Sequence, residues 1–263
     1  MAKRTSTWSL TGISLAVLVM VFSSFAAPAS GVTGREVMEQ AKKSNQSETQ
    51  ISEVHLLLVD KQATEQERSI KIWAIQGDKD KSLTRFTQPK SVTGVGFLVI
   101  AEGGDAQRWL YMPRSRKTRM IAEGDKNKPF MGTDFTYYDL SPHDIDGEAF
   151  DPVQEGECDG HPCYIVRGRS KTPETSLYGD VVKFVRKDNW VPIRVDFYDQ
   201  KGELLKRSRV LDLNQIDGNW TPMKVEMHNV QTDHKTIMTI TKIEYNEEIP
   251  QRYFTKAHLE KGR

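Results

Sequence analysis

The stretch Val191-Pro192-Ile193-Arg194-Val195-Asp196-Phe197-Tyr198 decides the fold class of this 263-residue chain. Apolar Val, Ile, Val and Phe alternate in it with Pro, Arg, Asp and Tyr, and a period of two indicates a strand with one buried face. Gln200-Lys201-Gly202 follows as a turn signal. Because this unit of an alternating run and a short turn recurs along the chain, we expect a mainly β protein.

Several other segments repeat the pattern. Alternating runs occur at 70–74, 223–228 and 237–243, and turn signals occur at 76–78, 103–105 and 217–219. Strands at this spacing predict one large antiparallel sheet that curls into a barrel or half-barrel. Gly34 to Ser47 instead has the pattern of an amphipathic helix, with Val37, Met38 and Ala41 among polar residues.

The composition is that of an ordinary folded protein. Lys and Arg number 37 against 36 Asp and Glu, so the formal net charge is +1. A chain without excess positive charge lacks the field that attracts nucleic acid, so we expect no nucleic-acid partner. We expect a single domain from residue 30 to 263, because no linker or low-complexity tract divides the chain.

The N-terminus has the pattern of a secretory signal peptide. Lys3 and Arg4 precede an apolar run from Leu10 to Phe25, and Ala27-Pro28-Ala29 follows with small residues at the −3 and −1 positions. We therefore predict that residues 1–29 are removed and that the protein is exported to the periplasm. The alternative is an uncleaved anchor, although the apolar run is slightly shorter than the roughly 17–25 residues of a spanning helix.

Two cysteines, Cys158 and Cys163, bracket the turn-like tetrapeptide Asp159-Gly160-His161-Pro162. If the turn centres on Gly160 and His161, the cysteines face each other across a hairpin, and export favours a disulfide between them. Free thiols and a metal or redox site are the alternatives. A zinc site would need further ligands, and no second Cys/His pair exists in the sequence, so we expect no metal.

The alternation lapses from Gly124 to Pro152. A long, aromatic-rich segment without strand pattern inside a sheet protein is more often functional than decorative. Its apolar residues are candidates for a lid that closes over the sheet: Phe130, Met131, Phe135 and Tyr138.

The sequence also resembles a known family. The motifs are Arg108-Trp109-Leu110-Tyr111-Met112-Pro113, Arg116-Lys117-Thr118-Arg119, Phe130-Met131-Gly132-Thr133-Asp134-Phe135 and Tyr138-Asp139-Leu140. They resemble the outer membrane lipoprotein-sorting protein family, which is related to the periplasmic carriers LolA and LolB. The similarity extends from Arg85-Phe86 through Gly94–Leu98 to the closing segment Phe254–Leu259.

This resemblance implies an α+β fold that is mainly β, in which a curved antiparallel sheet forms an incomplete barrel with helices covering the concave face. It also implies an apolar cavity for acyl chains and, as a partner, an inner-membrane transporter of the resistance-nodulation-division (RND) type. LolA has an Arg-Pro step between early strands that this chain lacks at 75–79, so the cargo can be a lipid as well as a lipoprotein. The apolar alternates are the expected cavity wall: Ile70, Ile72, Phe86, Phe97, Val99, Leu110, Met112, Phe184, Val195 and Phe197.

A basic run follows the first motif. Arg114, Arg116, Lys117 and Arg119 lie within six residues and are a candidate docking patch for an acidic transporter surface or a lipid headgroup. A solvated hairpin tip is the alternative. Asp134 and Asp139 are nearby carboxylates that could neutralise part of the run.

We find no catalytic pattern in the sequence. It contains no Gly-x-Ser-x-Gly, His-Glu-x-x-His or Walker motif, so we expect neither enzymatic activity nor a cofactor. Two functions remain: a carrier that holds acyl chains, or a non-carrying periplasmic accessory protein that binds and regulates a membrane transporter.

Overall fold

The computed structural model describes residues 31–44, 47–77, 79–102, 105–142 and 144–261. The predicted signal peptide, residues 1–29, lies outside the described residues. Among the described helices, none is long and apolar enough to cross a membrane.

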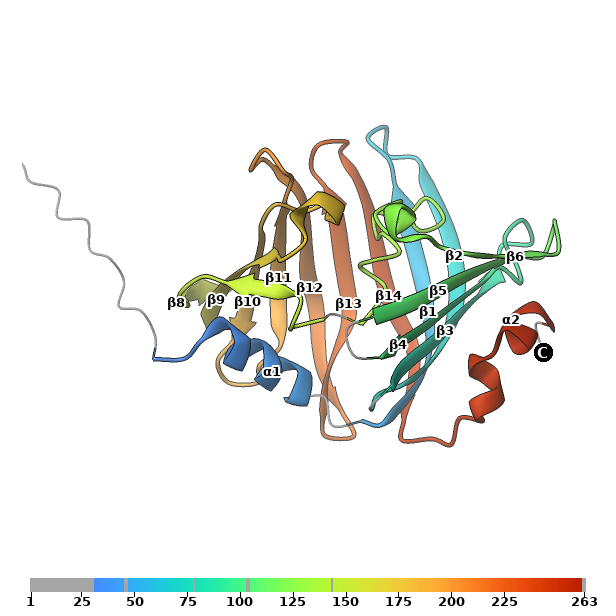
Figure 1. Cartoon of the computed structure of the whole chain (residues 1–263), viewed down its shortest axis with the longest axis horizontal. Helices are drawn as coiled ribbons and strands as arrows, with labels where there is room; N and C mark the ends of the chain where they lie inside the picture. Colours follow the sequence, from blue (N-terminus) through green and yellow to red (C-terminus); the bar gives the residue numbers. More distant parts are fainter. Residues whose placement is uncertain (1–30, 45–46, 78, 103–104, 143, 262–263) are drawn as a thin grey trace, which may run out of the picture.

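One antiparallel sheet accounts for most of the structure (Figure 1). Its strands are β1 (Thr49–Val59), β2 (Glu65–Ile75), β3 (Lys79–Gln88), β4 (Gly96–Glu102), β5 (Asp105–Met112), β6 (Lys117–Met120), β7 (Glu148–Phe150), β8 (Gln154–Cys158), β9 (His161–Ser170), β10 (Val181–Arg186), β11 (Pro192–Tyr198), β12 (Leu204–Ile216), β13 (Asn219–Asn229) and β14 (His234–Tyr245). The helices are α1 (Gly34–Ser44) and α2 (Lys256–Lys261), with short 3₁₀ turns at Glu123–Asp125, Pro173–Thr175 and Gln251–Phe254. The mainly β prediction is confirmed.

The strand order makes the sheet an open half-barrel. It runs β6-β5-β4-β3-β2-β1-β14-β13-β12-β11-β10-β9-β7, and β8 also pairs with β9. The first and last strands, β1 and β14, therefore pair in the middle, while β6 and β7 lie at opposite ends. The chain has to cross from one end of the sheet to the other between them, and Figure 1 shows this segment passing across the hollow of the curved sheet.

The two faces of the sheet bury different clusters. Phe97 and Leu110 are cross-strand partners and face the hollow, whereas the adjacent pair Leu98 and Trp109 faces outward. The C-terminal helix α2 packs through Leu259 on this outer, convex face. The expectation that helices cover the concave face thus holds for α1 but not for α2, because the apolar residues of β3, β4 and β5 supply a second buried surface on the convex side.

Helix α1 covers the concave face near β9 and β10. Its Val37 is fully buried against Val166 and Val185. The helix begins with a capping box, in which the backbone N–H of Thr33 donates to Glu36 Oε2 (2.7 Å) and that of Glu36 donates to Thr33 Oγ1 (3.2 Å). The described helix runs to Ser44, and Ser47, the predicted last residue, is not helical.

The Asp-Gly turns have the backbone geometry of two-residue β-hairpin loops. Asp217 and Gly218 both have positive φ, and Ile216 pairs with Asn219 across them. Asp159 and Gly160 repeat this geometry, so Cys158 pairs with His161 and Cys163 with Gly156. The predicted turn centre was therefore wrong by one residue, because an Asp-Gly pair adopts the two left-handed positions more easily than Gly-His.

Candidate functional site

The segment that crosses the hollow, residues 121–142, is called the lid segment below. It contains a tight hairpin at residues 129–136, in which Pro129 bridges to Thr136 and the N–H of Phe130 donates to the carbonyl of Phe135 (2.7 Å). At its tip Met131 and Gly132 have positive φ, and Arg68 donates to the carbonyl of Met131. The lid segment is therefore an ordered element of the fold. Part of the predicted strandless range, 148–150, forms the short strand β7.

Aromatic packing fixes the lid segment to the N-terminal half of the sheet. Phe130 is 2% exposed, and its ring centroid lies 5.6 Å from that of Phe86, 5.2 Å from that of Phe97 and 5.7 Å from that of Tyr137. Such distances are favourable for aromatic pairs. Phe130 thus fills the concavity itself, whereas a residue that only closed its mouth would be partly exposed.

A buried ion pair fixes the same segment to the C-terminal half of the sheet. Nζ of Lys206 on β12 lies 3.0 Å from Asp139 Oδ2 and donates to the carbonyl of Asp134 (2.9 Å). The hydroxyl of Tyr178 donates to Asp139 Oδ1 (2.8 Å). Burial beside this carboxylate raises the pKa of Tyr178. Breaking a buried pair by removing one partner is strongly destabilising, so Asp139 is an anchor of the lid segment.

A second polar anchor involves Asp134. Its Oδ2 lies 2.8 Å from Nδ1 of His234 and accepts a hydrogen bond from the hydroxyl of Thr236 (2.7 Å). Both aspartates are thus engaged with β12 and β14. The expectation that they neutralise the basic run is wrong, because the register of the sheet presents cations and hydroxyls to them from the opposite half.

Nine of the ten predicted wall residues lie on the concave face. Ile70, Phe86, Phe97, Val99 and Leu110 form one buried cluster with Ile72 and Met112 packed against it, and Val195 and Phe197 belong to a second cluster with Phe135 and Tyr178. Met131 packs on the first cluster and Tyr138 on the second. The lid segment therefore covers most of the predicted wall.

Phe184 is the exception and has to be corrected. It packs against the cluster of Cys158, Cys163 and Ile193 on the convex face, with the guanidinium of Arg194 over its ring at 4.7 Å. Strand β10 has apolar residues on both faces, so its sequence pattern does not indicate which face lies inside the sheet's hollow.

Between α1, the lid segment and the sheet lie two cavities. The larger, about 480 Å³, is lined by Met38 and Ala41 of α1, by Ala74 and Ile75 of β2, and by residues 139–142 of the lid segment. The smaller, about 120 Å³, lies against Val181, Val195 and Phe197. Met38 and Pro192 line both, so the two cavities adjoin. Their combined size falls in the range of roughly 300–1,000 Å³ that is typical of small-molecule sites.

Several polar groups interrupt the apolar lining of the smaller cavity: Tyr138, Glu148, Arg169, Ser170, Ser176, Tyr178 and Lys183. Nζ of Lys183 lies 2.6 Å from Glu148 Oε2, and both side chains are nearly buried. Tyr138 closes the other side, and burial raises the pKa of its hydroxyl to about 12. The charged groups are paired, Lys183 with Glu148 and Arg169 with Asp151, and the rest of the lining includes the apolar side chains of Met38, Val181, Val195 and Phe197.

The cysteines and the basic run lie outside the cavities. Cys158 and Cys163 are buried free thiols, and burial raises the pKa of Cys163 to about 11; their disulfide stays a prediction. Arg114, Arg116, Lys117 and Arg119 are all exposed on the β5–β6 hairpin, next to Met120, which is 64% exposed. The described residues include no group of three or more His, Cys, Asp or Glu that could hold a metal ion.

Sequence reasoning missed the polar anchors and α1 as a cavity wall. Lys206, His234 and Thr236 carry no local signal, because their partners are 67 to 102 positions away. Arg108 had a usable signal. It lies two and four residues before Leu110 and Met112 and therefore faces the same, inner side of the strand. A charged residue at an inward-facing position of a strand indicates a polar site.

An open, curved antiparallel sheet with a segment lying in its hollow defines the LolA class of half-barrels. A LolA superfamily protein from Nitrosomonas europaea has this fold with a TM-score of 0.69 and 18% identity, over 86% of this chain and 99% of that one. A family model described as "Uncharacterized protein" matches residues 78–261, which is more than half of the chain. The protein belongs to that family, and its structural neighbours are outer membrane lipoprotein-sorting, LolA-superfamily and DUF1329 proteins.

Two further solved structures are more similar. A domain assigned as an outer membrane lipoprotein-sorting protein from Vibrio parahaemolyticus is 28% identical with a TM-score of 0.81, over 86% of this chain and 98% of that one. A DUF1329 family protein from Desulfovibrio piger is 26% identical with the same TM-score of 0.81, over 86% of this chain and 97% of that one. A search of curated protein sequences finds no match.

Proposed function

We propose that this protein is a periplasmic carrier that binds the acyl chains of a lipid or lipoprotein and transfers them toward the outer membrane. The observation that carries the proposal is the pair of adjoining cavities between α1, the lid segment and the concave face. The similarity to a protein assigned to lipoprotein sorting supports it. The mechanism is sheltering without catalysis, and no cofactor takes part.

The free energy of sheltering is large. Each methylene removed from water contributes about 0.8 kcal/mol, so a 16-carbon chain gains on the order of 10 kcal/mol. The cavities accept the first part of a chain. When the lid segment moves away from the sheet, the chain continues along the wall now covered by Phe130, where Phe86, Phe97 and Leu110 become accessible. The lid segment and the chain thus compete for one apolar surface.

The exposed basic hairpin is proposed as the docking patch. Its four cations, on Arg114, Arg116, Lys117 and Arg119, are exposed, and although Arg119 interacts electrostatically with Asp125, the run as a whole is accessible to an acidic surface. An inner-membrane RND-type transporter is the proposed partner, and the mature protein reaches it after export.

The decisive experiment is organic extraction of the purified protein followed by mass spectrometry, together with titration of a fluorescent fatty acid. A carrier yields a stoichiometric lipid and binds the probe. Ala41→Trp projects a large side chain from α1 into the larger cavity, and we expect it to weaken probe binding at least tenfold.

Lys43→Trp is the matched control. Lys43 lies on the same helix, is exposed, and does not line either cavity. Equal probe binding by the two variants would contradict the larger cavity as the binding site. The absence of extractable lipid and of probe binding would contradict the carrier function and favour the accessory protein.

A further inference from the structure

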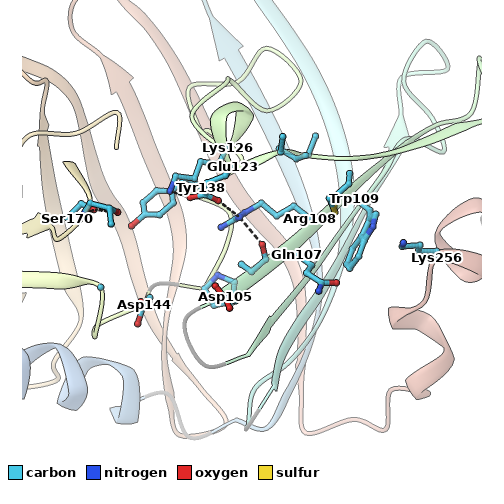
Figure 2. A pocket seen from close by; sticks show the side chains of 17 residues that line it. Asp105, Gln107, Arg108, Trp109, Glu123, Lys126, Tyr138, Asp144, Ser170 and Lys256 are labelled. Atoms are coloured by element: carbon cyan, nitrogen blue, oxygen red, sulfur yellow. Dashed lines mark hydrogen bonds and ion pairs between the residues drawn. The ribbon is translucent and has the colours of Figure 1, made fainter. Parts of the chain in front are cut away.

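The two open ends of the sheet enclose a third cavity, of about 620 Å³. Figure 2 shows its lining, which comes from the start of β5, the first residues of the lid segment and, across the gap, Ser170 at the end of β9. Unlike the two cavities described above, it is lined largely by polar and charged side chains. We call it the seam cavity.

Arg108 on β5 is the most buried charge of the seam cavity. Its side chain is 7% exposed. Nε donates to the hydroxyl of Ser141 (2.8 Å), and Nη1 donates to the carbonyl of Ala106 (2.9 Å). The carboxylate paired with it is that of Glu123, with Oε2 at 3.9 Å from Nη1. A guanidinium stays charged even when buried, so Arg108 is a sheltered cation with a distant counterion.

Lys126 adds a second sheltered cation. Its side chain is 12% exposed, and Nζ forms an ion pair with Oε1 of the same Glu123. Nζ also lies 5.5 Å from the centroid of the Tyr138 ring. Glu123 itself is 61% exposed. Two cations with mostly buried side chains therefore share one carboxylate that is largely exposed, and Figure 2 shows Glu123 beside Lys126 and Arg108.

The lining also contains Asp105, Asp144 and Lys256, so its formal charges balance overall, and Arg108 and Lys126 are distinguished by their burial. Asp144 Oδ1 accepts the backbone N–H of Asp146 (3.0 Å), and Asp105 is exposed at the start of β5. Lys256 lies over the ring of Trp109 at 4.8 Å, on the convex side. The buried part of the lining, at Arg108 and Lys126, thus carries two positive charges beside the exposed carboxylate of Glu123.

The seam cavity also adjoins the apolar cavities. Tyr138 lines both the seam cavity and the 120 Å³ cavity, and Pro142 lines both the seam cavity and the 480 Å³ cavity. These two residues of the lid segment therefore separate a polar compartment from two apolar ones. An amphiphile with a charged head and an aliphatic tail matches this division.

We propose that the seam cavity binds a phosphate group, carried by an amphiphile whose acyl chain passes Tyr138 and Pro142 into the apolar cavities. The phosphate takes the place of Glu123 between Arg108 and Lys126. The planar guanidinium of an Arg and the ammonium group of a Lys both bind phosphate oxygens well, and burial away from water strengthens these hydrogen bonds. This assignment rests on the proposed carrier function and specifies the class of cargo.

The test compares three probes by isothermal titration calorimetry: palmitoyl lysophosphatidic acid, monopalmitoylglycerol and inorganic phosphate. We expect lysophosphatidic acid to bind at least tenfold more tightly than monopalmitoylglycerol, which has the same chain and no phosphate. Inorganic phosphate should bind far more weakly than the lipid. Equal affinity for inorganic phosphate would mean that the site takes free anions, and it would overturn the assignment of a lipid headgroup.

Three variants locate the phosphate. Glu123→Gln removes the competing carboxylate and should raise the affinity for lysophosphatidic acid severalfold, whereas Lys126→Gln should lower it about tenfold. Lys128→Gln is the matched control, because Lys128 is 63% exposed, pairs with Asp125 and does not line the seam cavity. Lys126 is preferred to Arg108 as the test position because Arg108 also holds Ser141 of the lid segment.

A failure of the phosphate site and a failure of the carrier function give different results. If both amphiphiles bind with equal affinity and the three variants match the wild type, the phosphate site is refuted while the carrier function stands. If neither amphiphile binds, the proposed carrier function itself is refuted.

Discussion

Replacing Phe130 by Ala should weaken the hold of the lid segment on the sheet and thereby strengthen ligand binding. The ring is buried between Phe86, Phe97 and Tyr137. Truncating a fully buried Phe destabilises a protein by about 3–5 kcal/mol, because the transfer free energy is lost and a cavity remains. We therefore expect Phe130→Ala to lower the free energy of unfolding in urea by this amount.

The effect on binding has the opposite sign under the proposed competition. The apparent dissociation constant equals the intrinsic constant divided by the fraction of molecules whose concave face is open. Weaker packing of the lid segment raises that fraction. If about 1.4 kcal/mol of the lost free energy appears as easier opening, the affinity for a fluorescent fatty acid rises tenfold. Faster hydrogen exchange of the Phe130 amide, which is bonded to the carbonyl of Phe135, should accompany the change.

Phe254→Ala is the control for this experiment. Phe254 is 4% exposed and packs with Leu83 and Leu98 on the convex face. Its truncation should destabilise the protein by a similar amount and leave the affinity for the probe unchanged. If Phe130→Ala and Phe254→Ala lose the same stability and both leave the affinity unchanged, the lid segment is permanent core and the competition model is wrong.

Four further predictions follow from the described contacts and from the sequence. Lys206→Met leaves the carboxylate of Asp139 buried without its cation and should lower the free energy of unfolding in urea by about 3–5 kcal/mol. Adding Asp139→Leu to the same chain should restore much of this stability. If the double variant recovers none of it, the ion pair is not the cause of the loss. The pKa of Tyr138 is raised to about 12, above the usual value near 10, so between these pH values the folded state keeps a proton that the unfolded state loses. The free energy of unfolding should therefore fall by about 2–3 kcal/mol as the pH rises from about 10 to 12. Tyr138→Phe should reduce this loss when unfolding is measured across the same pH range. Cys158 and Cys163 should form a disulfide after export, and intact mass before and after reduction tests this; two alkylatable thiols in the unreduced protein would refute it. N-terminal sequencing of the exported protein should begin at Ser30, and retention of Lys3 would instead indicate an anchor.

The site was less predictable than the fold. The lid segment was identified because its apolar and aromatic residues lack a strand period, yet its position was not. Phe130 was expected at the mouth of the concavity and lies within it. The local sequence pattern does not indicate how deep Phe130 lies, since an apolar residue in a loop is compatible with a place at the rim of a concavity or in a core. The depth of Phe130 follows from the two sheet edges that the lid segment has to connect.

Sequence by itself determined the β class, the turn at Asp217-Gly218 and the inward parity of most wall residues. These features depend on near neighbours, because a period of two and a left-handed turn are properties of a few consecutive residues. Tertiary structure alone decided which face of β10 is inside, and hence that Phe184 lies on the convex face. It also brought Asp139 to Lys206, and Glu123 between Arg108 and Lys126. These contacts exist because the curvature of the sheet closes the hollow around a segment that crosses it, and curvature is set by the packing of all strands together.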